Sequence, residues 1–530
     1  MPMYDVLIKN ARVVDGAGNP WFLADVAIAG DRIVRVSRGL AGEARLVLDA
    51  SGLILCPGFI DSHTHSDLRI LKHPEDEAKI MQGVTSALLG QDGLSVAPVG
   101  DETLDLMKRR VSGLLGTYVT SWTWRTTAEY LTAVEAVEPA TNVLMMVPHS
   151  SVRAEVVGWE NRPAEPHEID RMKALVSRSM EEGAIAFSTG LIYPPGMYAG
   201  PTEMVELLKT AGKYGGFFVV HMRNESDHVM ESVREVAGYA KESGVPLHIS
   251  HLKVGGRRNW GRAVELLCLI DEYRASGLDV TFDQYPYVAG STMLDATVPP
   301  WVHEGGVGKM LLRLQDPKVR DDIRKDQAGT SGLVWENWPE SCGFDRIVVT
   351  AVRSEKNRFA EGKTILDISS ALGRDPTDVI CDLLIEEDDA VTMAIFYGDE
   401  QDMRTIMRHS AMIVCSDGIV GGKPHPRVYG TCPRVLGRYV REEKVLTLEE
   451  AVRKMTSAPA QRLGLKDRGL IREGQFADIA AFDPATIADT ATFAEPNQFP
   501  VGVKFVLVNG VLTMKDGALT GARAGKVLRR

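Results

Sequence analysis

The stretch GFIDSHTHSD, residues 58–67, sets two histidines, His63 and His65, directly behind a short apolar run. If that run is a β-strand, residues two positions apart point to the same side of it. Imidazole nitrogens are good zinc ligands. At the carboxyl end of a barrel strand such a pair faces the mouth of the active site. Alone, the pair is equally compatible with a structural role, so its meaning depends on the rest of the chain.

Seven further segments combine an apolar run with a polar or glycine-rich end. They are residues 84–92, 142–150, 184–190, 217–222, 246–252, 280–287 and 412–418. Several are near-continuous apolar runs, as expected of parallel strands that are covered on both faces. Amphipathic helical patterns fill most of the gaps. Eight strands with intervening helices predict a (β/α)8, TIM-like barrel, and a doubly wound sheet is the alternative that strand counting does not exclude.

Both ends of the chain differ from this pattern. Residues 1–55 and 465–530 contain short strands separated by glycine and aspartate turns. We expect the two ends to pair into a small β-sandwich beside a barrel domain of residues 56–464. The gap between the seventh and eighth strands, about 290–410, is too long for a loop, which predicts an insertion there.

Composition narrows the class of protein. The 530 residues carry 60 lysines and arginines against 71 aspartates and glutamates, a net charge of −11, so no broad basic surface indicates nucleic acid or an anionic membrane. The start, MPMYDVLIKN, lacks the features of a signal peptide, and no apolar run approaches the roughly 18 residues of a membrane span. The six cysteines are far apart and form no CxxC pair. We expect a reduced, soluble, cytoplasmic protein of unknown oligomeric state.

Polar residues also end several of the other predicted strands. They are Asp92, His221, His251 and Asp417. A strand buried on both faces needs no polar residue for packing, so five strands that end in histidine or aspartate indicate a shared metal site at the carboxyl edge of the barrel. His248 lies three residues before His251, so we expect it on the opposite strand face, packed in the core.

Longer motifs are spread over the chain. They are GFIDSHTHSD, HMRNE, ISHLK, YPYVAGST, CSDG, HPRVYGTCPRVLGRYV and the closing MTSAPAQRLGLKDRGLIREGQFADIAAFDP. Together they resemble the D-aminoacylase (N-acyl-D-amino-acid deacylase) branch of the amidohydrolase superfamily over nearly the whole chain. The resemblance implies a metal-dependent (β/α)8 barrel with a β-sandwich built from both termini. It also implies hydrolysis of the amide bond of N-acyl-D-amino acids, which releases a carboxylate and a free D-amino acid.

The resemblance implies a role for each strand-end residue. His63 and His65 would hold the more exposed metal ion, and His221 and His251 the deeper one. Asp417 would be the catalytic carboxylate. Its residue type suits that task, because a metal ion lowers the pKa of bound water and a carboxylate accepts the released proton. Asp417 would then pass the proton to the departing amine.

One position departs from many members of the family, which carry cysteine where this chain has Asp92. A carboxylate is a harder ligand than a thiolate and can bridge two ions through its two oxygens. Asp92 is therefore expected to be a bridging ligand, although an aspartate in a glycine turn is the structural alternative. We expect one or two zinc ions per chain, with other divalent metals possible.

An N-acylated amino acid also needs a site for its carboxylate. The candidates, most of them implied by the resemblance, are Lys253, Tyr193, Tyr285, Ser291 and Arg223. A lysine supplies a point charge, and hydroxyl groups add directional donors. Lys253 lies two positions beyond His251 and shares its inward face if the strand continues.

Other functions stay open at this point. A cyclic-amide hydrolase of the hydantoinase or dihydroorotase kind often uses a carboxylated lysine on strand four, and the segment AIAFSTG has none. A dipeptide hydrolase and a non-catalytic metal-binding protein are the further alternatives. The sequence does not reveal the preferred acyl chain or side chain, and the preference for D over L substrates rests on the resemblance alone.

Overall fold

Eight parallel strand positions follow one another along the chain of the computed structural model, which describes residues 3–119 and 121–529. They are β6 (Phe59–Asp61), β7 (Val84–Leu89), β8 and β9 (Asn142–Met145 and Val147–Pro148), β10 (Phe187–Gly190), β11 (Phe218–His221), β12 (Leu247–Ile249), β13 (Val280–Gln284) and β17 (Met412–Val414). Hydrogen bonds join them in the orders β6-β7-β8 and β9-β10-β11-β12-β13-β17, and every one of these pairings is parallel.

The two groups of strands meet at both edges. Only Met146 separates β8 from β9, and its N–H donates to the carbonyl of Leu89 in β7. At the other edge the N–H of Asp417, just past β17, donates to the carbonyl of His63, just past β6, over 2.8 Å. The strands therefore follow one another around a ring, and the predicted (β/α)8 fold is confirmed over the doubly wound alternative.

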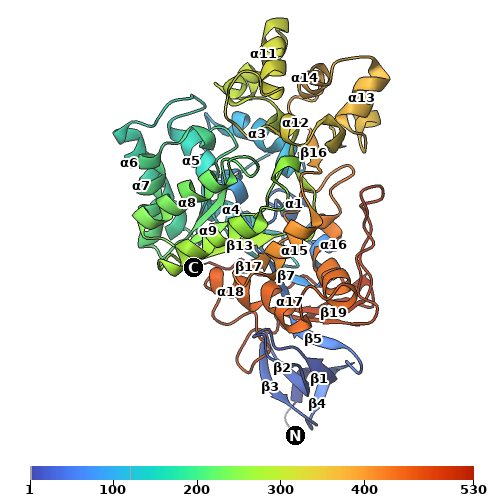
Figure 1. Ribbon diagram of the computed structural model, residues 1–530. Helices are drawn as coiled ribbons and strands as arrows, with labels where there is room; N and C mark the ends of the chain where they lie inside the picture. Colours follow the sequence, from blue (N-terminus) through green and yellow to red (C-terminus); the bar gives the residue numbers. More distant parts are fainter. Residues whose placement is uncertain (1–2, 120, 530) are drawn as a thin grey trace.

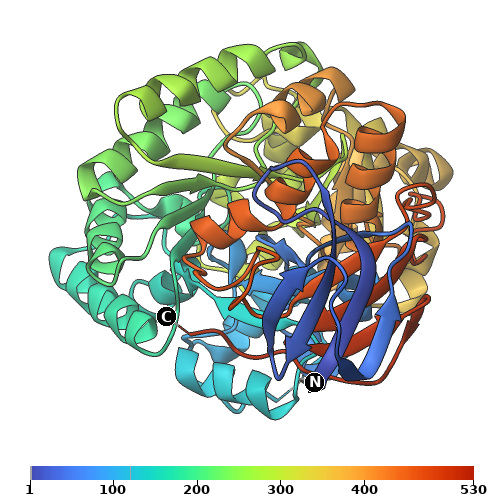
Figure 2. The ribbon, with the colours of Figure 1, turned by 90° about the horizontal axis from the view of Figure 1, so that it is seen from below.

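Helices surround this ring, as Figure 2 shows. They include α5 (His149–Val156), α6 (Pro166–Glu181), α7 (Pro201–Lys213), α8 (Val229–Ser243), α9 (Ala263–Ala275), α15 (Glu400–Arg408), α17 (Leu448–Met455) and α18 (Ser457–Arg462). In α6 the residues Ile169, Met172 and Val176 form a buried stripe that faces the core. Gly244 follows α8 with a left-handed φ of 73°, a conformation that glycine adopts at little cost.

The remaining helices near the strand ends are short or lie in loops. They are α1 (Arg69–Lys72), α2 (Glu77–Ile80), α3 (Leu104–Leu115), α4 (Thr127–Ala136) and α16 (Arg427–Arg434). Within the residues that the structure describes, none of the helices has the length and apolar character needed to cross a membrane.

Both ends of the chain contribute to one nine-stranded sheet, at the bottom of Figure 1. Its strands are β1 (Met3–Val13), β2 (Phe22–Ala29), β3 (Arg32–Ser37), β4 (Glu43–Asp49), β5 (Ile54–Pro57), β18 (Ile479–Phe482), β19 (Val503–Val508), β20 (Val511–Lys515) and β21 (Ala518–Leu519). Antiparallel pairing of β5 with β18 joins the two ends. Residues of both, such as Ile8 and Phe505, share one buried core, as predicted. The domain limits at about residues 55 and 465 stay a proposal.

The predicted insertion lies between β13 and β17, at the opposite end of the molecule from the terminal sheet (Figure 1). It contains an antiparallel sheet of β14 (Gly290–Met293), β15 (Ile347–Ala351) and β16 (Thr392–Ile395). Its helices are α10 (Val307–Arg313), α11 (Pro317–Gln327), α12 (Trp338–Ser341), α13 (Ile365–Leu372) and α14 (Pro376–Glu386). Residues of this insertion form one wall of the pocket described next.

Candidate metal centre

A buried ion pair fixes the segment that carries His63 and His65. Asp61, the last residue of β6, accepts a hydrogen bond from Lys79 Nζ at 2.6 Å. The same carboxylate accepts from the backbone N–H of Ser416 at 2.8 Å, which ties the end of β6 to the segment after β17. Because a buried charge is tolerated only when it is paired, this contact holds the two segments in one arrangement.

The four predicted histidine ligands converge on one oxygen atom. Oδ2 of Asp92 lies 3.4 Å from His65 Nε2 and 3.5 Å from His63 Nε2. The same oxygen lies 3.8 Å from His251 Nε2 and 3.9 Å from His221 Nδ1. The ends of four different strands thus place five polar side chains around a single point, and all five are buried.

Asp417 lies on the side of His63 and His65. Its Oδ1 is 3.5 Å from His63 Nε2 and 3.3 Å from His65 Nε2. Its other oxygen, Oδ2, lies 2.8 Å from Nη1 of Arg427, in α16. Burial on its own raises the pKa of Asp417, but the Arg427 cation and the neighbouring histidines together lower the pKa below its ordinary value. The carboxyl group is therefore held as a carboxylate.

Three of these residues have an unusual backbone conformation. Asp92, His251 and Asp417 have φ angles of 53°, 35° and 48°, in the left-handed region that residues with a side chain rarely occupy. Such a conformation costs on the order of 1–3 kcal/mol per residue and persists where the surroundings fix it. Here the N–H of His251 donates to Asp283 Oδ1 at 2.5 Å, and that of Asp417 donates to the His63 carbonyl.

The residues present fit a metal ion. Among the described residues, several buried ring nitrogens and one carboxylate oxygen have no hydrogen-bond partner: both nitrogens of His63 and of His221, Nδ1 of His65 and Oδ1 of Asp92. Leaving a buried polar atom unpaired costs about 1–3 kcal/mol, which a bound cation would offset. Histidine nitrogen and carboxylate oxygen are donors that zinc accepts.

Three sets of candidate ligand atoms lie close together: His63, His251 and Asp417 form one, and the other two share Asp92. His63, His65 and Asp92 offer atoms within 4.8 Å of one another, and so do Asp92, His221 and His251. Asp92 therefore stands where a carboxylate would bridge two ions.

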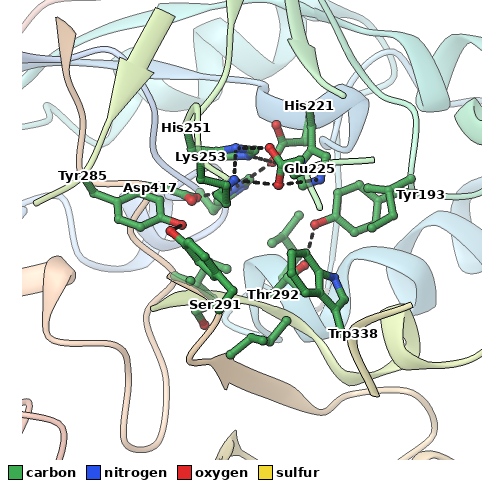
Figure 3. Close-up of a pocket in the computed structure, with 18 residues that line it drawn as sticks. Tyr193, His221, Glu225, His251, Lys253, Tyr285, Ser291, Thr292, Trp338 and Asp417 are labelled. Carbon is green, nitrogen blue, oxygen red and sulfur yellow. Dashed lines mark hydrogen bonds and ion pairs between the residues drawn. The ribbon is translucent and has the colours of Figure 1, made fainter. Parts of the chain in front are cut away.

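Four of the five predicted substrate residues line the pocket beside this centre. They are Tyr193, Lys253, Tyr285 and Ser291, and Figure 3 shows them around Asp417 and the histidines. The hydroxyl of Tyr193 hydrogen-bonds to Thr292 Oγ1 at 2.6 Å. That of Tyr285 accepts from Tyr397 at 2.9 Å.

Arg223 is not brought to this pocket. Its Nη2 pairs with Glu235 at 3.0 Å, and Nη1 donates to the Met197 carbonyl at 2.8 Å. It lines a neighbouring cavity of about 190 Å³ instead. The reason is local, since Arg223 lies two residues beyond His221, after the end of β11, where the strand alternation no longer sets its direction.

Two buried residues of the site had no predicted role. Arg427 donates through Nη2 to the Ser291 carbonyl at 3.0 Å, and its guanidinium lies 4.4 Å from the centre of the Tyr285 ring. Glu225 contacts His251 and Lys253. Both belong to motifs noted in the sequence, HPRVYG and HMRNE, but neither is part of a strand pattern that would show which way its side chain points.

His248 occupies the place predicted for it. It is buried, Nδ1 hydrogen-bonds to Thr281 Oγ1 at 2.8 Å, and Nε2 lies 3.0 Å from Asp283 Oδ2. It is thus a satisfied core histidine rather than part of the pocket.

Comparison with known proteins agrees with this geometry. Residues 46–514 match the amidohydrolase family. A D-aminoacylase of Alcaligenes xylosoxydans xylosoxydans is 36% identical over 533 residues, which span 99% of this chain and 98% of that protein. Solved structures of D-aminoacylase, one of them a study of its binuclear metal centre, are 35% identical with a TM-score of 0.84, over 99% of this chain and 100% of theirs. An N-acyl-D-glutamate deacylase from Bordetella bronchiseptica, solved with zinc and a phosphonate mimic of the tetrahedral intermediate, is 31% identical with a TM-score of 0.85 over the full length of both chains.

Proposed function

The chain belongs to the amidohydrolase family, and we propose that it is a zinc-dependent N-acyl-D-amino-acid deacylase. It hydrolyses the linear amide bond of an N-acyl-D-amino acid and releases a carboxylate and a free D-amino acid. The observation that carries this proposal is the convergence of four histidines on Asp92 beside a separate carboxylate, Asp417, in one buried pocket. A purely structural metal site needs no such additional carboxylate.

The role of each residue follows from its position in the pocket. His63, His65, His221, His251 and Asp92 would hold the zinc, with Asp92 shared between two ions. Zinc bound there polarises the amide carbonyl and activates water for attack.

Asp417 performs the proton transfers. Arg427 holds its Oδ2, so Oδ1 is the oxygen that faces His65 and the pocket. That oxygen accepts a proton from the attacking water and returns it to the nitrogen of the departing amine, which leaves as the D-amino acid. The positive charge of Arg427 keeps Asp417 ready to accept.

The substrate carboxylate is bound on the opposite wall of the pocket. Tyr285 and Ser291 supply hydroxyl donors there, and Arg427 lies directly behind them, against both residues. Lys253 lines the same pocket but is already paired with Glu225, at 2.6 Å, so it contributes its charge through that pair. A cluster of hydroxyl donors with an arginine behind it is suited to a carboxylate. Tyr193 closes the side next to Thr292.

The cyclic-amide alternative has less support. Strand four, β10, reads FSTG and carries no lysine that a carboxylated bridge would need. A cytoplasmic location and the lack of nucleic-acid or membrane partners remain part of the proposal, supported by the net charge of −11 and by six cysteines that are all free.

The proposal is tested with paired N-acetyl-D- and N-acetyl-L-amino acids, with metal analysis of the same preparation. We expect release of free amino acid from the D series, loss of activity on chelation and recovery with zinc. The panel includes N-acetyl-D-glutamate and N-acetyl-D-leucine, which separate acidic from apolar side-chain preference. Equal rates on both enantiomers, or no amino acid released from any of them, contradict the proposal.

A further inference from the structure

We infer that Glu225 is a positioning residue that orients His221 and His251 toward the metal ion they share. The inference rests on the proposed metal centre. Glu225 follows β11 by four residues and is 1% exposed. In Figure 3 it lies beside His221, His251 and Lys253, with dashed contacts to His251 and Lys253.

Each of the two histidine rings has one nitrogen near Asp92 and the other nitrogen near Glu225. In His251, Nε2 lies 3.8 Å from Asp92 Oδ2, and Nδ1 lies 3.0 Å from Glu225 Oε1. In His221 the nitrogens are exchanged: Nδ1 lies 3.9 Å from Asp92 Oδ2, and Nε2 lies 3.5 Å from Glu225 Oε2. The two rings therefore present different nitrogens to the metal position, and one carboxylate faces the outer nitrogen of both.

This arrangement decides which nitrogen carries the proton. A neutral histidine can bind a metal only through the nitrogen that lacks a proton, and an acceptor at the opposite nitrogen fixes the proton there. Glu225 is a hydrogen-bond partner of His251 Nδ1, a nitrogen that also lies 2.7 Å from Lys253 Nζ. Toward His221 the Glu225 carboxylate faces Nε2 at 3.5 Å, and its negative charge favours a proton on that nitrogen although no hydrogen bond is formed there. Without it, each ring is free to protonate on the side that faces the metal.

The position of Glu225 is fixed by three other contacts. Lys253 Nζ lies 2.6 Å from Glu225 Oε2 and balances its buried charge. Gly255 N–H donates to the Glu225 carbonyl at 2.7 Å. The Glu225 N–H donates to Glu336 of the insertion. The carboxylate therefore has little freedom to move away from the two rings.

The other histidine pair does not use Glu225. Nδ1 of His63 lies 3.7 Å from Asp283 Oδ2, and Nδ1 of His65 has no hydrogen-bond partner among the described residues. Loss of Glu225 should therefore weaken one metal position and leave the other as it is. This selectivity distinguishes a positioning role from a general effect on folding.

The test measures zinc affinity in a His65→Ala background, in which the His221 and His251 position is titrated alone. Glu225→Gln keeps the size of the side chain but removes the charge and one acceptor oxygen. The matched control is Asp227→Asn, on the same loop, where the carboxylate pairs with Arg258 and Asn259 away from the histidines. Affinity is measured by competition with a chelator, and the unfolding temperature is measured on the metal-free proteins.

We expect Glu225→Gln to lower the zinc affinity about 10- to 100-fold, the usual effect of losing an outer partner of a ligand histidine. Asp227→Asn should stay within about twofold of its background. Glu225→Gln should unfold at a lower temperature without metal, because Lys253 loses its buried partner, but both variants should be fully folded at the temperature of the zinc titration. If Glu225→Gln does not fold, Glu225→Asp replaces it. Aspartate keeps the negative charge beside Lys253, but its shorter side chain no longer reaches the two histidine rings.

Unchanged zinc affinity in the Glu225 variant, or an equal loss in the Asp227 variant, overturns the inference. The measurement needs no substrate. If no N-acyl-D-amino acid is hydrolysed but the affinity falls as expected, the proposed reaction fails and the positioning role stands.

Discussion

Nη1 of Arg427 lies 2.8 Å from Oδ2 of Asp417, and the arginine is fully buried. The same guanidinium touches the Ser291 carbonyl and the Tyr285 ring. One cation thus connects the candidate base to the wall that is proposed to bind the substrate carboxylate. Substitutions at either end of this contact should separate the two roles.

Asp417→Asn should keep its metal and lose most of its turnover. Asparagine retains the size of the side chain but accepts no proton, and loss of a general base typically lowers kcat about 10²- to 10⁴-fold. Turnover of an N-acetyl-D-amino acid and metal content are measured on one preparation, with the surface variant Asp101→Asn as control. Normal hydrolysis by Asp417→Asn would rule out the assigned mechanism.

Arg427→Met should move the acidic limb of the kcat/KM profile to higher pH. The Arg427 cation helps to lower the pKa of Asp417, and the active form is the carboxylate. Removing the cation raises that pKa, so a higher pH is needed to deprotonate Asp417. Arg427→Lys keeps a positive charge and should shift the limb less. The explanation is wrong if the limb of Arg427→Met coincides with that of the unaltered protein.

Asp92→Asn should reduce the number of bound ions from two to one. Asparagine has one oxygen and no charge, so it is a poor bridge between two cations. The number of ions per chain is obtained by elemental analysis after dialysis against a metal-free buffer. Retention of two ions would show that Asp92 is not the shared ligand.

Glu336→Gln should change how stability depends on pH. Burial, with the nearby charge of Glu225, raises the pKa of Glu336 to about 8. Its side chain accepts from Ser226 Oγ and from the Glu225 N–H. Between about pH 4.3, where an exposed glutamate ionises, and pH 8, the folded protein holds a proton that the unfolded chain has released. The free energy of unfolding therefore falls as pH rises through that window.

Glutamine has no proton to lose, so the Glu336 variant should lack this slope. Relative to the unaltered protein its stability should improve from pH 5 to pH 8, by on the order of 1 kcal/mol per pH unit. Urea unfolding at several pH values measures the difference, with Glu340→Gln, at the partly exposed end of the same segment, as control. Parallel curves for the Glu336 variant and the unaltered protein would contradict the expectation.

The barrel strands and their polar ends could be predicted because both depend on local pattern. The apolar runs before His221 and Asp417 mark buried strands, and in a parallel barrel all strand ends meet at one edge. Arg427 and Glu225 could not be assigned in this way. Their partners depend on how a loop returns after its strand, and no period in the sequence records that direction.

The contacts of the insertion are even harder to predict from the sequence pattern. Its existence follows from the length between two strands, but the contact of Glu336 with the Glu225 loop joins residues 111 positions apart. Arg223 is a further example: it lies two positions from His221 in sequence but lines the neighbouring cavity rather than the pocket beside the histidines. Beyond the end of a strand, closeness to a ligand in sequence therefore does not predict closeness to it in space.

The left-handed backbone at Asp92 and Asp417 has a consequence for engineering. Glycine adopts such φ angles without strain, so Asp92→Gly or Asp417→Gly would relieve the backbone while removing a proposed metal ligand or the proposed base. Methods that select variants for thermal stability alone will therefore favour inactive proteins at these two positions. The active site is a place where this chain forgoes stability for catalysis, and stabilising changes should be sought elsewhere in the barrel.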